Sequence, residues 1–237
     1  RGTRVDDAHW FPGARLNYAR SLLADGTDAS IAIIGESQSR EPLQLTFGEL
    51  RAEVARCAMA LRSLGVGVGD RVAAYLPNCP EAVIAFLATA SLGAIWSSCS
   101  PEFGVRAVVD RFAQIGPKVL FAVTGYRYGA KDIDRTADLS EIVRALPALE
   151  ELIVLEYAST APAPENIGTV PARVATFADL MKAGDPADLD FAEVPFDHPL
   201  YVLYSSGSTG LPKPIVHGHG GILLEHFKAL GLHHDIG

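Results

Sequence analysis

A short run of hydroxyl-bearing and glycine residues lies between an apolar stretch and a lysine, in LYVLYSSGSTGLPKPIVHGHGG, residues 200 to 221 of the 237-residue chain. Glycines let a backbone curl and bring its amide hydrogens close to a ligand, and hydroxyls and a lysine ammonium suit phosphate oxygens. The residues of this kind are Ser205, Ser206, Gly207, Ser208, Thr209, Gly210 and Lys213. Their types and spacing predict a cradle for a polyphosphate.

The same residues allow other interpretations. The Walker pattern requires Gly-Lys-Ser/Thr running into a helix. Here Pro212 precedes the lysine and the apolar pair Ile215-Val216 follows it, so a strand–loop–strand hairpin is favoured. A flexible turn of serine and glycine that joins two strands and binds nothing has a similar composition. Composition alone does not choose between the cradle and the turn.

Strands and helices, which would position this loop, alternate along the chain. Continuous apolar runs predict strands at 71–77, 94–100, 118–123, 152–157, 173–177 and 199–205. Helices are predicted at 47–64, 80–92, 101–115, 139–147 and 178–184, and 158–172 is expected to be a surface loop. Thr46 and Glu49 have the spacing of a capping box before the helix at 47–64, and the runs at 31–36 and 43–47 suggest a hairpin. Apolar strands that are each followed by a helix predict an α/β fold, with mostly parallel sheets flanked by helices.

Composition narrows the class of protein. Apolar residues make up 49% of the chain and charged residues 20%, as in an ordinary globular protein. The formal charge of −8, with no stripe of lysine and arginine, argues against a nucleic-acid partner. The longest apolar run, 82–96, is shorter than the roughly 20 residues that a membrane span needs. Three dispersed cysteines predict no disulfide framework and favour a reducing, cytoplasmic location. His217 and His219 have no third ligand at metal spacing, so no metal site is predicted for them.

The string YSSGSTGLPKP at 204–214 resembles the phosphate-binding signature of the adenylate-forming enzymes, which include the acyl-CoA synthetases, the luciferases and the adenylation domains of peptide synthetases. The segments at 10–23 and 65–104 resemble the short-chain acyl-CoA synthetases. Those at 95–112, 125–131 and 213–233 resemble the acetoacetyl-CoA synthetase branch. The acetyl-CoA branch usually has glycine in place of Pro214 and a Phe-Gly-Gly run near Ser100.

The resemblance implies ATP, Mg²⁺ and coenzyme A as substrates or cofactors, and it implies roles for particular residues. The seven residues of the 205–213 loop would wrap the β- and γ-phosphates of ATP while a carboxylate attacks the α-phosphorus. Arg127 would lie against the adenine and 3′-phosphate end of coenzyme A, with Lys131 close enough to assist. Ser100, Pro101 and Glu102 would line the same groove.

The resemblance also implies a longer parent protein. In the family, the adenine-binding segment, the acidic residue that holds magnesium, the aspartate that grips the ribose and a mobile carboxy-terminal domain all follow the phosphate loop. The chain is thus expected to be the amino-terminal portion of the large domain. It would comprise a first segment (1–30), an α/β subdomain (31–199) and the phosphate-loop hairpin with its following helix (200–237). The intact parent would ligate acetoacetate to coenzyme A, and the isolated portion would be inactive. The alternatives are a parent that uses acetate or propionate, and a non-catalytic α/β module.

Overall fold

The computed structural model describes residues 10–184, 189–205 and 210–235. The strands are Arg15–Leu16 (β1), Ile31–Gly35 (β2), Leu43–Thr46 (β3), Arg71–Tyr75 (β4), Ile95–Cys99 (β5), Val119–Val123 (β6), Gly125–Tyr128 (β7), Lys131–Asp134 (β8), Glu151–Leu155 (β9), Arg173–Thr176 (β10), Val194–Pro195 (β11), Pro199–Ser205 (β12) and Lys213–Gly218 (β13). The α-helices are Tyr18–Ala24 (α1), Phe47–Ser63 (α2), Pro80–Ser91 (α3), Val105–Ile115 (α4), Thr136–Arg144 (α5), Phe177–Ala183 (α6) and His219–His226 (α7). A 3₁₀ turn, Pro164–Ile167 (η2), and a π-helical segment, Phe227–His233 (η3), complete them.

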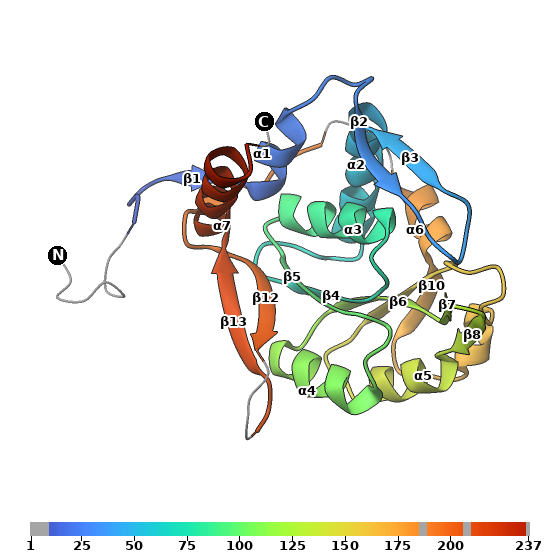
Figure 1. The fold of residues 1–237 in the computed structure, drawn as a ribbon. Helices are drawn as coiled ribbons and strands as arrows, with labels where there is room; N and C mark the ends of the chain where they lie inside the picture. The colour runs from blue at the N-terminus through green and yellow to red at the C-terminus, as the bar shows by residue number, and fades with distance from the viewer. Residues whose placement is uncertain (1–9, 185–188, 206–209, 236–237) are drawn as a thin grey trace.

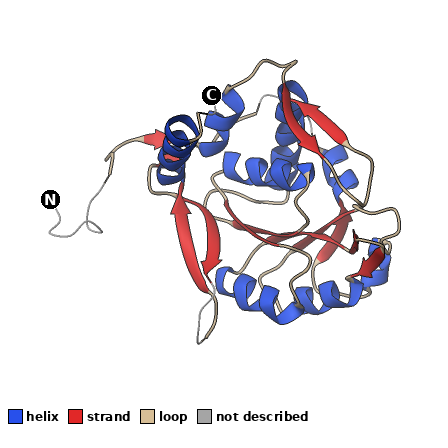
Figure 2. Ribbon diagram, in the orientation of Figure 1, coloured by secondary structure: helices blue, strands red, loops and turns tan. Residues whose placement is uncertain are grey.

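The central sheet has seven strands in the order β10-β9-β6-β4-β5-β12-β13. All neighbours are parallel except β12 and β13, which form an antiparallel hairpin at one edge. Figure 1 shows α4 and α5 on one face of the sheet and α2, α3 and α6 on the other. The secondary-structure colouring in Figure 2 shows the sheet between these two helical layers. The predicted α/β fold with a mostly parallel sheet is confirmed.

The core lies on both faces of the sheet because alternate residues of each strand point to opposite sides. On β4, Val72 and Ala74 belong to the apolar cluster under α2 and α3, whereas Ala73 and Tyr75 belong to the cluster under α4 and α5. All four side chains are fully buried. A strand that is buried on both faces is apolar over most of its length, which is why the predicted strands are largely continuous apolar runs.

Two helix starts show how local sequence sets the boundaries. The capping box at the start of α2 is present: the hydroxyl of Thr46 accepts a hydrogen bond from the Glu49 amide, and the Glu49 carboxylate accepts one from the Thr46 amide. The helix predicted at 101–115 begins later, at Val105. The hydroxyl of Tyr75 lies 2.8 Å from the carbonyl oxygen of Pro101 and 2.7 Å from that of Phe103, and it holds this segment in a turn.

Some short elements were not predicted. β7 and β8 form a separate two-stranded hairpin, and β1 pairs with β11 across almost the whole length of the sequence. The 158–172 segment, expected to be a loop, contains η2, which buries Ile167. These elements are two to four residues long and carry few consecutive apolar residues, so they have no periodic pattern that a sequence could show.

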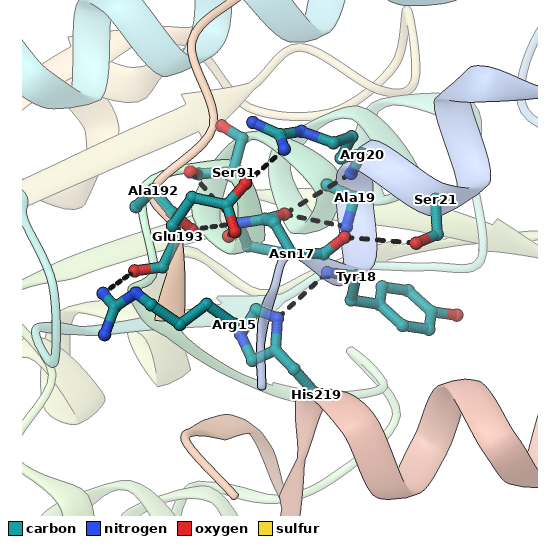
Figure 3. A network of polar contacts seen from close by, with 11 residues as sticks. Arg15, Asn17, Tyr18, Ala19, Arg20, Ser21, Ser91, Ala192, Glu193 and His219 are labelled. Carbon is teal, nitrogen blue, oxygen red and sulfur yellow. Dashed lines mark hydrogen bonds and ion pairs between the residues drawn. The ribbon is translucent and has the colours of Figure 1, made fainter. Parts of the chain in front are cut away.

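A buried asparagine ties the first segment to the rest of the fold, as Figure 3 shows. Asn17 is only 1% exposed. Its Oδ1 accepts hydrogen bonds from two amides in the first turn of α1. Its Nδ2 donates to the carbonyl oxygens of Ala90 and Ala192, each at 2.9 Å. An ion pair between Arg20 and Glu193 lies beside it. One side chain therefore joins α1, the end of α3 and the segment that leads into β11.

The long apolar run at 82–96 is divided between α3 and β5. Among the described residues, no helix is long and apolar enough to cross a bilayer. The thiols of Cys57, Cys79 and Cys99 are free and buried. Burial raises the pKa of Cys57 and of Cys79 to about 12 and that of Cys99 to about 11. These cysteines are protonated at neutral pH and act as packing residues.

Candidate functional site

The parallel strands place their carboxyl ends along one edge of the sheet, where the loops that follow them meet. The loop after β4 leads to α3 on one face, and the loop after its neighbour β5 leads to α4 on the opposite face. Open α/β sheets bind ligands where neighbouring loops diverge in this way. A pocket of ≈ 380 Å³ lies there, lined among others by Asn78, Ser98 and Ser100.

The predicted phosphate loop joins β12 to β13, so the strand–loop–strand interpretation is confirmed. Ser205 ends β12 and Lys213 begins β13, and the two are paired across the hairpin. A side chain at Gly210 would meet nothing within 4 Å, so this position is open on its Cβ side. Four of the predicted loop residues lie outside the described residues: Ser206, Gly207, Ser208 and Thr209. The described structure thus brings Ser205 and Lys213 together at the base of the loop.

Helix α4 holds the base of this loop. Nε2 of Gln114 donates a hydrogen bond to the carbonyl oxygen of Pro212 at 3.0 Å. The hydroxyl of Tyr204 donates a hydrogen bond to the carbonyl oxygen of Arg111 at 2.8 Å. Burial raises the pKa of Tyr204 to about 12, so it stays a donor. The Arg111 guanidinium lies 5.0 Å from the centre of the Phe103 ring and 5.8 Å from that of Tyr204. One side chain therefore links the phosphate hairpin to the loop after β5.

The sequence did not reveal these supporting residues. Arg111 and Gln114 are three positions apart on a helix, which is the spacing of an ordinary solvated face. Gln114 donates to a backbone carbonyl oxygen, and Arg111 contacts the Tyr204 hydroxyl through its own carbonyl oxygen, and backbone groups carry no sequence signal. Only the packing of α4 beside β12 brings them into contact.

The loop after β5 contains the predicted coenzyme A residues Ser100, Pro101 and Glu102. Pro101 is buried, whereas Ser100 and Glu102 are exposed. The Ser100 hydroxyl accepts a hydrogen bond from the Glu102 amide at 3.4 Å. Because Ser100 also lines the pocket beyond β4 and β5, this loop forms one wall of that pocket.

The other predicted coenzyme A residues lie on the β7–β8 hairpin, which follows β6. Arg127 is paired with Asp132, and Tyr128 is paired with Lys131. Directly paired residues share a face of a two-stranded ribbon, and successive residues point to opposite faces. Arg127 and Lys131 therefore lie on opposite faces. The Arg127 Nε is 4.0 Å from the Asp132 carboxylate, and Lys131 shares its face with the exposed ring of Tyr128.

The two histidines after the phosphate loop have separate environments. The ring of His217 packs on Tyr201, with ring centres 5.2 Å apart. His219 begins α7 and is fully buried, and its Nδ1 accepts a hydrogen bond from the Tyr18 amide at 3.0 Å. Among the described residues, no group of three His, Cys, Asp or Glu side chains could hold a metal ion.

His219 makes the stability of the fold depend on pH. Burial, with a smaller contribution from His198, lowers the pKa of His219 from 6.5 to about 4. As the pH falls through this window, His219 binds a proton in the unfolded chain before it does so in the folded chain. The contribution of neutral His219 to the free energy of unfolding is therefore complete above pH 6.5 and is lost toward pH 4. We expect His219 to lower the free energy of unfolding by about 2 kcal/mol between pH 7 and pH 5.

Urea unfolding at a series of pH values tests this expectation. In His219→Asn the amide oxygen can accept the bond from Tyr18 but does not titrate, so this variant should lose less stability on acidification than the wild type. His233→Asn, at an exposed position, should behave like the wild type. Parallel pH profiles for wild type and His219→Asn would contradict the assignment.

The fold places the chain in the class of open α/β proteins, which bind ligands beyond the carboxyl ends of their strands. Within this class the chain belongs to the AMP-binding enzyme family, whose model matches residues 24–235. The family predicted from the phosphate-loop string is thereby confirmed.

The chain is similar to acetoacetyl-CoA synthetases over nearly its whole length. It is 43% identical to acetoacetyl-CoA synthetase of Danio rerio over 236 residues, which cover 97% of this chain and 35% of that protein. It is 45% identical to acetoacetyl-coenzyme A synthetase of Rhizobium meliloti over 232 residues, which cover 98% of this chain and 35% of that protein. The solved structure of acetoacetyl-CoA synthetase from Streptomyces lividans matches with a TM-score of 0.87 and 49% identity, over 97% of this chain and 34% of that one. The chain thus spans about a third of the length of these relatives.

Proposed function

We propose that this chain is the amino-terminal portion of the large domain of an acid–thiol ligase that joins acetoacetate to coenzyme A at the expense of ATP. The observation that carries the proposal is the 204–214 string, whose described ends form the last residues of β12 and the first residues of β13. The similarity to acetoacetyl-CoA synthetases supports it. We further propose the three units 1–30, 31–199 and 200–237 as its parts.

In the proposed reaction an oxygen of the acetoacetate carboxylate bonds to the α-phosphorus of ATP, and the bond from that phosphorus to the bridging oxygen of pyrophosphate breaks. The coenzyme A sulfur then attacks the acyl carbon and AMP leaves. We assign Ser205 to Thr209, Gly210 and Lys213 to the leaving phosphates, where amides, hydroxyls and an ammonium stabilise negative charge. Magnesium bound together with ATP would neutralise more of that charge. We assign no protein ligand for magnesium among the described residues.

We place the coenzyme A nucleotide against the β7–β8 hairpin through Arg127, with Ser100, Pro101 and Glu102 along the groove. Lys131 is kept as a secondary contact, because the register turns it to the other face of the hairpin. The proposed location is the cytoplasm, in accord with the three separate free cysteines. The proposed partners are the small-molecule substrates.

Acid-dependent exchange of label between pyrophosphate and ATP by the intact protein tests the proposal. We expect exchange with acetoacetate at a kcat/KM at least about tenfold above that with acetate or propionate, since one or two groups in an acyl pocket discriminate on this scale. Residues 1–237 alone should show no exchange. Equal rates with all three acids would refute the acetoacetate assignment, and the absence of exchange with any acid would refute the ligase.

A further inference from the structure

The loop that joins β2 to β3 lies against the β7–β8 hairpin, although about 90 residues of chain separate them. We call four of its residues, Ser37 to Arg40, the 37–40 loop. Oε1 of Gln38 accepts a hydrogen bond from the Gly129 amide at 3.0 Å, and the Ser39 hydroxyl accepts one from the Arg127 amide at 3.2 Å. Arg127 lies on β7 and Gly129 lies in the turn that follows it. The two side chains therefore contact the backbone at the end of β7 and at the tip of the hairpin.

The ends of the 37–40 loop are fixed to the body of the fold. The Arg40 guanidinium donates two hydrogen bonds of 2.6 Å to the carboxylate of Glu81, in the first turn of α3. It also lies 4.8 Å from the centre of the Tyr157 ring, just beyond β9. The Ser37 and Tyr157 hydroxyls are 2.6 Å apart. Paired hydrogen bonds between arginine and a carboxylate are strong and directional, so the loop is a stiff support.

The hairpin needs such a support at its tip. Its base is closed by the Arg135 amide, which donates to the carbonyl oxygen of Thr124 at 2.7 Å, and is tied to the fold by the Thr124 hydroxyl, which donates to the carbonyl oxygen of Pro162 at 2.6 Å. A two-stranded hairpin is marginally stable by itself. The ion pair between Arg127 and Asp132 is long and about half exposed, and such pairs contribute little to rigidity. Of the described contacts at the tip, those from Gln38 and Ser39 hold the backbone that carries Arg127.

We propose that Gln38 and Ser39 are positioning residues for coenzyme A: they fix the backbone of Arg127, so that its guanidinium meets the 3′-phosphate of the nucleotide. This inference rests on the proposed function, which assigns Arg127 to coenzyme A, and it adds a role in thioester formation for a loop outside the phosphate cradle. It assigns no contact between Gln38 or Ser39 and the substrate. Their removal therefore weakens coenzyme A binding and leaves the adenylation step intact.

The test compares coenzyme A with dephospho-coenzyme A, which lacks the 3′-phosphate, in the intact protein. For the double variant Gln38→Ala with Ser39→Ala we expect KM for coenzyme A to rise about five- to tenfold, as the loss of one to two modest hydrogen bonds implies. kcat and the ATP–pyrophosphate exchange rate should stay within about twofold of wild type. KM for dephospho-coenzyme A should be the same in variant and wild type.

Two further variants separate positioning from a general loss of structure. Ser39→Thr keeps the hydroxyl acceptor and should retain most of the affinity for coenzyme A. Gln44→Ala, on the exposed face of β3, should leave KM unchanged. Hydrogen exchange should be faster at the Arg127 and Gly129 amides in the double variant.

An unchanged KM for coenzyme A would overturn the inference even if those amides exchange faster, because the loop would then be structural only. An equal rise in KM for both forms of coenzyme A would overturn the link to the 3′-phosphate. A wild-type protein that forms no acyl-CoA would refute the proposed function, and this inference with it. If the wild-type protein does form acyl-CoA, an unexpected KM in the variants would overturn only this inference and not the proposed function.

Discussion

Lys213→Ala is expected to slow acetoacetate-dependent ATP–pyrophosphate exchange by the intact protein about 10- to 100-fold. Lys213 is the first residue of β13, and its backbone is fixed by pairing with Ser205. Its side chain is exposed beside the phosphate loop. A hydrogen bond between an ammonium and a phosphate oxygen contributes about 1.5–3 kcal/mol, which corresponds to this range of rates.

A matched control removes one positive charge at a position far from the phosphate loop in the sequence. Lys182→Ala removes a lysine that pairs with Asp179 on α6, and it should keep the wild-type rate. Lys213→Arg retains the charge but not the compact shape of the ammonium, so it should recover part of the activity. A Lys213→Ala variant with a rate within twofold of wild type would exclude the lysine from the phosphate cradle.

Asn17→Ala is expected to lower the free energy of unfolding of residues 1–237 by about 3 kcal/mol. The variant loses the cap of α1, a contribution of about 1 kcal/mol. It also leaves the carbonyl oxygens of Ala90 and Ala192 without the donor that Asn17 supplies, at about 1 kcal/mol each. Urea unfolding measures the change as a lower midpoint at an unchanged slope.

Asn17→Asp separates the two contributions. The aspartate can still cap α1, but it places a carboxylate oxygen against the carbonyl oxygens of Ala90 and Ala192, which repel it, so it should destabilise the fold at least as much as alanine. Asn166→Ala, at an exposed position in η2, should change stability by less than about 0.5 kcal/mol. An Asn17→Ala variant as stable as Asn166→Ala would show that the network in Figure 3 contributes nothing net to folding.

The elements that the sequence predicted well are those whose evidence is local. α2 begins after Thr46 because its capping box needs only residues three apart, and β4, β6 and β9 carry continuous apolar runs because both faces of the sheet are covered. α4 was placed four residues early because the Tyr75 hydroxyl, on another strand, holds the turn before it. The β7–β8 hairpin was missed because Tyr and Arg alternate there without an apolar pattern.

The candidate site divides in the same way. The sequence by itself determined the family, the alternation of strands and helices, and the phosphate-loop string, because these depend on residue types at short spacing. Only the tertiary structure decided the sheet order that brings the loops after β4 and β5 together, the support of the phosphate hairpin by Arg111 and Gln114, and the placement of Arg127 and Lys131 on opposite faces. The same holds for the 37–40 loop beside β7. Most of these relations depend on hydrogen bonds to backbone groups or on strand pairing, and backbone groups are the same in every residue and leave no trace in the order of side chains.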